Sequence, residues 1–141
     1  PRTFFCLPSR ALAWFVLTQM VRNKPFVLVL EDDPVSAEAL MLVLQDWGAE
    51  VAHAPHAALV DHALGARAAE LHYIIADYDL GDGPTGVAVA SDLLSTAQRA
   101  RVLVLSGTLR ARSDIAARQA GFDMMRKPAR ADAIVAWLEA S

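Results

Sequence analysis

Cysteine is almost missing from this chain, which has 141 residues and a single cysteine, Cys6. One thiol cannot form an intramolecular disulfide, and it cannot supply the cysteine cluster of a structural zinc site. The sequence also has no run of about 18 apolar residues, which excludes an ordinary membrane-spanning helix. These absences favour a reducing compartment, and we expect a cytoplasmic location.

Acidic side chains are missing from the first 24 residues, which carry four basic groups and a balance of +4. The rest of the chain has nine basic and sixteen acidic side chains, which gives it a net charge of −7. The net charge of the whole chain is −3. A mildly negative chain is a poor nucleic-acid binder, because binding neutralises phosphates with Lys and Arg. We therefore divide the sequence into an apolar, basic extension at 1–24 and one compact domain at 25–141.

Short apolar runs alternate with helical patterns after Pro25. The run 26–30 is continuously apolar, as in a strand that is buried on both faces. Asp33 followed by Pro34 predicts a helix start, and Gly48 predicts its end. Five such strand-helix units in a row predict a parallel sheet with helices on both faces. Strands are predicted at 26–30, 50–53, 73–76, 102–105 and 123–125, and helices at 34–47, 56–68, 87–95, 113–120 and 130–140.

The extension has its own helical pattern, at 10–22. Thirteen helical residues span about 20 Å, which is short of the roughly 30 Å core of a bilayer. Residues 11–17 are apolar all round, so their exposure to water is costly. Three interpretations remain open: packing on the domain or on a second copy in a homodimer, the end of a longer chain, or a targeting segment.

Polar residues follow the predicted strands at their carboxyl ends, where open parallel sheets bind ligands. They are the acidic runs 31–33 and 77–79, then Ser106 and Lys127. Clustered carboxylates repel, and a hard divalent ion such as Mg²⁺ relieves this repulsion through oxygen ligands. An aspartate beside such an ion can take a phosphoryl group, whose charge a lysine and a hydroxyl then stabilise.

Four motifs follow one another along the chain: Val29-Leu-Glu-Asp-Asp-Pro34, Ile75-Ala-Asp77 followed by Gly86, Val104-Leu-Ser-Gly107, and Lys127-Pro128. In this order they resemble those of the receiver domain of bacterial two-component response regulators. The resemblance covers about 25–140 and none of 1–24. It implies a flavodoxin-like, doubly wound five-stranded parallel sheet of order 2-1-3-4-5, here with an N-terminal helical extension.

The resemblance implies a role for each matching residue. Asp77 would be the phosphoacceptor, which takes its phosphoryl group from a phosphohistidine on a histidine kinase or phosphotransfer protein. Ser106 and Lys127 would bind phosphoryl oxygens, and the Lys127-Pro128 bond would be cis. Such a domain is a switch and not an enzyme: phosphorylation changes the surface that a downstream protein binds.

The resemblance also implies a magnesium site. Glu31 and Asp32 would bind Mg²⁺, with Glu31 acting through water. Asp77 and the backbone carbonyl of Asp79 would complete the ligands from the protein.

Two features depart from the family pattern. The loop after Asp77 is one residue longer than in the family pattern. Gly81 stands at the position of the usual proline, and Gly86 comes one residue later than the usual glycine. Met124 stands three residues before Lys127, where the family commonly has an aromatic ring that acts in the switch.

Other functions are weighed against this one. Asp77-Tyr78-Asp79 fits the Asp-x-Asp motif of haloacid-dehalogenase-like phosphatases, but those enzymes carry it on their first strand and here it follows the third. A receiver-like module that only binds partners would not need the complete set of acids, hydroxyl and lysine. A nucleotide site is not indicated, because the chain has neither G-x-G-x-x-G nor a P-loop motif. The domain is either stand-alone, a relay intermediate, or part of a hybrid sensor kinase.

Overall fold

A computed structural model describes residues 9–22, 24–107 and 111–140. Within these residues, five strands form one sheet in the order β2-β1-β3-β4-β5, and every neighbouring pair is parallel. The predicted flavodoxin-like order is therefore confirmed. The strands are β1 (Phe26–Leu30), β2 (Glu50–Ala54), β3 (Tyr73–Asp77), β4 (Arg101–Ser106) and β5 (Asp123–Arg126).

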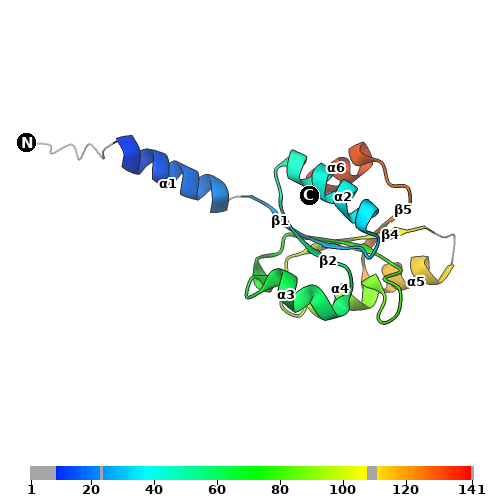
Figure 1. Cartoon of the computed structure of the whole chain (residues 1–141). Coiled ribbons are helices and arrows are strands. Elements are labelled where there is room, and N and C mark those ends of the chain that lie inside the picture. The colour runs from blue at the N-terminus through cyan, green and yellow to red at the C-terminus, as the bar shows by residue number, and fades with distance from the viewer. Residues whose placement is uncertain (1–8, 23, 108–110, 141) are drawn as a thin grey trace, which may run out of the picture.

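The helices of the α/β part cover both faces of the sheet. Helices α2 and α6 lie on one face, and α3, α4 and α5 lie on the other (Figure 1). Two short 3₁₀ turns, Ala57–Leu59 and Ala68–Glu70, flank α3. The helices are α1 (Ser9–Arg22), α2 (Pro34–Trp47), α3 (Val60–Leu64), α4 (Gly86–Leu93), α5 (Ala111–Ala120) and α6 (Ala131–Glu139).

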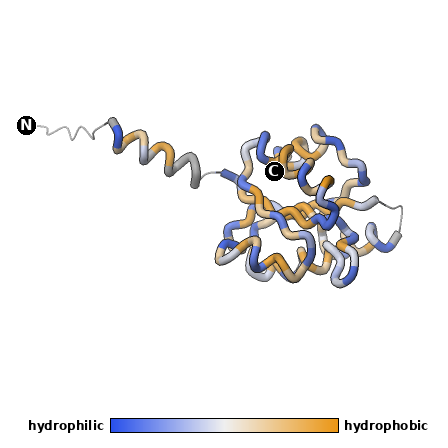
Figure 2. The backbone as a smooth tube through the Cα atoms, viewed as in Figure 1, coloured by the Kyte–Doolittle hydropathy of each residue, from blue (hydrophilic) through white to orange (hydrophobic). Residues whose placement is uncertain are grey.

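The core lies in two layers, one on each face of the sheet. Along β1, Val27 and Val29 pack with α2 and α6, whereas Leu28 and Leu30 pack with the helices on the other face. All four side chains are fully buried. Burial of each contributes roughly 1.5–3 kcal/mol. The continuous apolar run that predicted this strand is thus the direct result of its central position, which Figure 2 shows as an orange band.

The ends of α2 follow the predicted capping pattern. The Asp33 carboxylate accepts a 2.8 Å hydrogen bond from the backbone N–H of Ser36. Hydrogen bonds from the Ser36 side chain and from its backbone N–H lower the pKa of Asp33 below its ordinary value. Gly48 ends the helix with φ of 111°, a left-handed conformation that glycine adopts without strain.

The predicted helix at 56–68 is wrong in its extent. Helix α3 covers only Val60–Leu64, between a 3₁₀ turn and Gly65. Val60 and Leu64, four residues apart, are the buried side chains of α3. The alanines around them add little apolar area, so the segment has no stripe long enough to hold a longer helix against the sheet.

The residues at the amino ends of β3, β4 and β5 pack against α6. The Tyr73 ring lies 5.5 Å from the Trp137 ring, and its hydroxyl donates to the Leu138 carbonyl at 3.1 Å. Trp137 donates its indole N–H to Asp123 at 2.8 Å, and the Arg101 guanidinium lies 4.6 Å from the Trp137 ring centre. These contacts fix the end of α6 against the first residues of β3 and β4.

Helix α1 lies outside the layers of the sheet (Figure 1). Its side chains Leu12, Trp14 and Leu17 are 54%, 76% and 60% exposed. Among the described helices, none combines the length and the apolar character that a membrane crossing requires.

Candidate functional site

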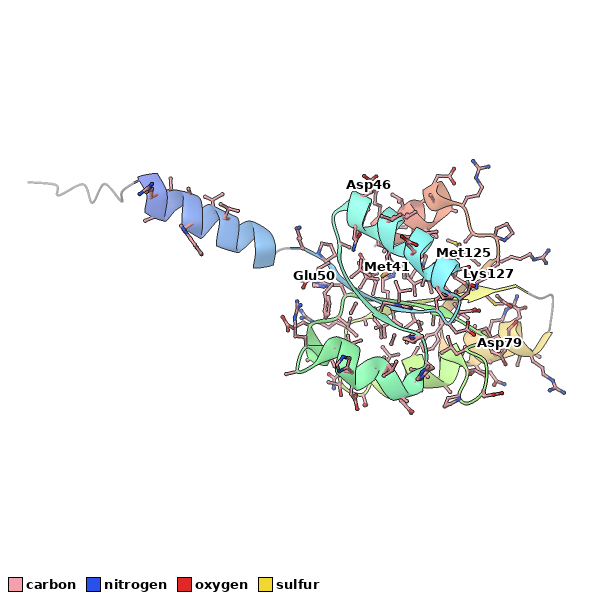
Figure 3. All side chains as sticks on the ribbon, viewed as in Figure 1. Met41, Asp46, Glu50, Asp79, Met125 and Lys127 are labelled. Atoms are coloured by element: carbon pink, nitrogen blue, oxygen red, sulfur yellow. The ribbon has the colours of Figure 1, made fainter. Side chains whose placement is uncertain are left out.

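The polar residues that follow the strands meet at the carboxyl end of the sheet. Asp77 is the last residue of β3 and Ser106 the last of β4, and both are buried. They line an open pocket of about 410 Å³ together with Glu31, Asp32 and Lys127. Figure 3 shows Lys127 and Asp79 at this end of the domain, and Glu50 at the opposite end.

Three carboxylates form a tight group in this pocket. Oxygen atoms of Glu31, Asp32 and Asp77 all lie within 4.8 Å of one another. Asp32 is exposed, whereas Glu31 is only 3% exposed. The backbone N–H of Asp33 donates to Glu31 Oε1 at 3.2 Å, which orients the buried side chain.

Lys127 is the cation that balances this group. Its ammonium nitrogen Nζ lies 2.8 Å from Glu31 Oε2 and 2.9 Å from Asp77 Oδ2. The backbone positions the lysine, because its N–H donates to the Ser106 carbonyl at 2.8 Å. The Lys127-Pro128 bond is cis, as predicted.

Burial and the hydrogen bond between Lys127 and Glu31 act in opposite directions on the pKa of each of these two residues. Burial raises the pKa of Glu31, and the nearby Asp77 charge adds to this, while the hydrogen bond from Lys127 opposes it. Burial alone would lower the pKa of Lys127, but the hydrogen bonds to Glu31 and Asp77 outweigh it, and the net pKa is raised. Lys127 is therefore charged at neutral pH.

The donor set fits a hard divalent cation. Carboxylate oxygens are the ligands that Mg²⁺ takes from proteins, and three of them meet here at one rim of the pocket. Asp79 lies beside them: its backbone N–H donates to Asp77 Oδ1 at 3.2 Å, and its own carboxylate accepts from the Gly81 N–H at 3.2 Å. Its predicted use of the backbone carbonyl stays a prediction.

The loop between β3 and α4 fits closely around Asp77. Gly81 has φ of 77°, and a side-chain carbon there would lie 3.5 Å from Asp32 Oδ2. The N–H of Gly86 donates to the Tyr78 carbonyl at 2.9 Å. A Cβ atom at Gly86 would overlap the carbonyl oxygen of Asp77 and lie 2.9 Å from its carbonyl carbon. Gly86, one step late in the sequence, thus occupies a position where only glycine fits.

We expect Gly86→Ala to destabilise the domain by at least about 1–3 kcal/mol, the usual cost of overpacking, because the methyl group meets backbone. Chemical denaturation followed by circular dichroism measures this change. The matched control is Gly107→Ala, whose Cβ would meet nothing closer than Lys127 Cδ at 3.9 Å. Equal unfolding midpoints for the two variants would contradict the expectation.

The structure adds two residues that the sequence did not single out. The Ser106 hydroxyl lies 3.1 Å from the hydroxyl of Ser113 in α5, and both serines are buried. The His53 side chain, at the end of β2, has Nε2 2.8 Å from the Glu31 carbonyl oxygen. Neither contact has a local signal, because each joins residues from different elements.

Met124 lies in β5 opposite Val104 of β4, in the register of the sheet. It is half-buried and packs against the core layer below the sheet. It carries no ring at the position where the family pattern has one.

Comparisons with known proteins give structural matches. No family model matches the sequence, and no curated protein matches it. Solved structures do match. A response regulator protein from Burkholderia pseudomallei, with a phosphorylated aspartic acid, a calcium ion and citrate, is 29% identical, with a TM-score of 0.70. That match covers 83% of this chain and 68% of the other.

Two further matches have the same shape at lower identity. The chemotaxis protein CheY4 of Vibrio cholerae is 21% identical over 83% of this chain and 98% of its own, with a TM-score of 0.70. The signal receiver domain of an HD domain-containing protein from Pseudomonas fluorescens Pf-5 is 17% identical over 83% and 93%, with a TM-score of 0.73. The α/β part of this chain therefore has the fold of response regulator receiver domains.

Proposed function

We propose, on this fold, that the chain is a phosphoacceptor receiver domain in two-component phosphorelay signalling, with Asp77 as the acceptor. One observation carries the proposal. The Asp77 carboxylate lines an open pocket, is hydrogen-bonded to Lys127, and lies with two further carboxylates within 4.8 Å. The Burkholderia pseudomallei response regulator, with its phosphorylated aspartic acid and calcium ion, supports this assignment.

In this phosphoryl transfer the chain mainly positions the reacting groups. A carboxylate oxygen of Asp77 attacks the phosphorus, the new P–O bond forms, and the bond from phosphorus to the donor breaks. The donor leaves as imidazole from phosphohistidine or as acetate from acetyl phosphate. Lys127 pairs with one phosphoryl oxygen, and the Ser106 hydroxyl donates to another.

The metal site belongs to this proposal. Glu31, Asp32 and Asp77 would hold Mg²⁺, together with the carbonyl of Asp79. The ion would neutralise part of the charge on the phosphoryl oxygens. The donor would be a histidine kinase or a histidine phosphotransfer protein, and the phosphorylated form would bind a downstream protein. The chain would thus act as a switch and not as an enzyme.

The alternative is an aspartate-nucleophile phosphatase, in which Asp79 would act as the acid of the Asp-x-Asp motif. Its carboxylate instead accepts the Gly81 N–H and shapes the loop. A phosphatase turns over a phosphate ester many times, whereas a receiver takes one phosphoryl group and holds it. Product release therefore separates the two functions.

Removal of the metal gives the first test. We expect the chain, incubated with Mg²⁺ and acetyl phosphate, to gain one phosphoryl group that is stable in acid and labile in base. With excess EDTA this adduct should not form, because three carboxylates and the phosphoryl charge would share one lysine. Intact-mass spectrometry measures the adduct. No adduct with Mg²⁺, or steady release of phosphate from an ester substrate, would overturn the proposal.

A further inference from the structure

The side chain of His53 provides the hydrogen-bond donor that holds the Glu31 carbonyl. Strand β2 ends at Ala54, before Pro55, and the Glu31 N–H reaches the Ala54 carbonyl only at 3.4 Å, which is long for a hydrogen bond. Along the described part of the chain, no backbone N–H donates to the Glu31 carbonyl. His53 Nε2 lies 2.8 Å from that oxygen, so the imidazole is the closer of the two links between Glu31 and β2.

This contact determines which nitrogen of the His53 ring carries a proton. A carbonyl oxygen can only accept a hydrogen bond, so Nε2 must be protonated and must donate. The side chain is half-buried, so water competes for this proton less than it would at the surface. His53 is therefore a fixed donor beside the acidic pocket.

The peptide bond between Glu31 and Asp32 connects two carboxylates of the proposed metal site. Because a peptide is planar, a rotation of the Glu31 carbonyl also changes ψ of Glu31 and φ of Asp32. Both side chains would then move relative to Asp77, whose carboxylate oxygen lies within 4.8 Å of theirs. The Glu31 carboxylate has its own hydrogen bonds, from the Asp33 N–H and from Lys127, whereas Asp32 is exposed. The direction of the Asp32 side chain therefore depends mainly on its backbone.

We propose that His53 is a positioning residue for the metal site: its Nε2–H holds the peptide between Glu31 and Asp32, and so directs the Asp32 carboxylate toward the cation. This inference rests on the proposed function, because it concerns the Mg²⁺ that phosphorylation of Asp77 would require. Mg²⁺ needs nearly ideal octahedral geometry, so a misplaced ligand lowers the affinity. Loss of a contact that orients the ligands commonly lowers metal affinity by about 10- to 100-fold.

Mg²⁺ titration of paired variants tests this role. We expect His53→Leu to raise the Mg²⁺ concentration for half-saturation about tenfold, because leucine fills similar space and has no donor. His53→Gln should stay within about twofold of the wild type, because its amide N–H can replace Nε2–H. Titration calorimetry of the full chain with Mg²⁺ alone measures both values.

The matched control is His56→Leu, the same substitution at an exposed histidine in the same segment, which should bind Mg²⁺ like the wild type. A purely structural role of His53 would weaken both His53 variants equally, because neither keeps the imidazole ring. Such an equal loss, or a wild-type affinity in His53→Leu, would overturn the proposal.

Nuclear magnetic resonance of the wild type tests the contact without any metal. The Nε2 proton of His53 should give a signal in nitrogen-edited spectra, because a half-buried, hydrogen-bonded proton exchanges slowly with water. The signal is assigned by its loss in His53→Gln. Absence of the signal, or an Nε2 atom without a proton, would contradict the contact even if a variant failed to fold.

These measurements separate this inference from the proposed function. If the wild type takes no phosphoryl group but the variants bind Mg²⁺ in the expected order, the proposed function fails and the role of His53 stands. If the wild type is phosphorylated and His53→Leu binds Mg²⁺ equally well, only the role of His53 is overturned. A wild type that binds no Mg²⁺ would overturn both.

Discussion

Asp77→Asn should abolish the phosphoryl adduct. The amide has nearly the shape of the carboxylate, and its single oxygen can keep one of the two present hydrogen bonds, from Lys127 to Oδ2 at 2.9 Å or from the Asp79 N–H to Oδ1 at 3.2 Å. The fold should therefore survive. The amide oxygen, however, lacks the negative charge that makes the carboxylate a nucleophile. Acetyl phosphate with Mg²⁺ should leave this variant unmodified in intact-mass spectra.

The control for this variant is Asp82→Asn, which makes the same chemical change in the loop that follows β3, at an exposed position. It should form the adduct at the wild-type level. An adduct on Asp77→Asn would mean that another carboxylate accepts the group, and fragment masses would then distinguish Glu31 from Asp32.

Lys127→Met should slow phosphorylation by acetyl phosphate by about 100- to 1,000-fold, the usual loss when one group that stabilises the transition-state charge is removed. Methionine keeps most of the length of the side chain and removes only the cation. In the present structure that cation contacts both Glu31 and Asp77. Rapid-quench measurement of adduct formation gives the rate.

Lys127→Met should bind Mg²⁺ more tightly than the wild type, although its phosphorylation is slower. The lysine charge repels a second cation and occupies oxygens of Glu31 and Asp77, so Lys127→Met should lower the Mg²⁺ concentration needed for half-saturation. The other lysine of the chain, the exposed Lys24, provides the control Lys24→Met. A normal phosphorylation rate in Lys127→Met would remove the lysine from the mechanism. Weaker Mg²⁺ binding would show that the lysine holds the carboxylates in place.

The central strands could be predicted because their environment is uniform. Every residue of β1 is buried, so the run at 26–30 had to be apolar throughout. The clustering of the polar residues at the strand ends could also be predicted, since parallel strands bring their carboxyl ends to one edge of the sheet. The segment at 56–68 could not be predicted, because its alanines are compatible with several backbone paths and Gly65 stops the helix.

The contacts between side chains were only partly predictable. Motifs indicated Lys127 as a phosphoryl-binding residue. Its contact with Glu31, however, depends on the positions of the two side chains in the folded structure. Ser113 gave no signal at all, because a serine near the start of a helix is common and its partner is seven residues away in another element. Local patterns report burial and capping, and they do not report which buried hydroxyls meet.

The packing of α6 also determines where a label or a tag can be attached to the α/β part away from the acidic pocket. Tyr73 and Arg101, at the starts of β3 and β4, bind the carbonyls of Leu138 and Trp137, and β1 begins at the same edge. A strand of five residues spans about 17 Å. A fluorophore, an immobilisation tag or a fused protein attached beside Phe26 or after Glu139 is therefore separated from Asp77 by the full length of the sheet. A chain that is captured on a surface through either position should therefore leave its acidic pocket accessible from solution.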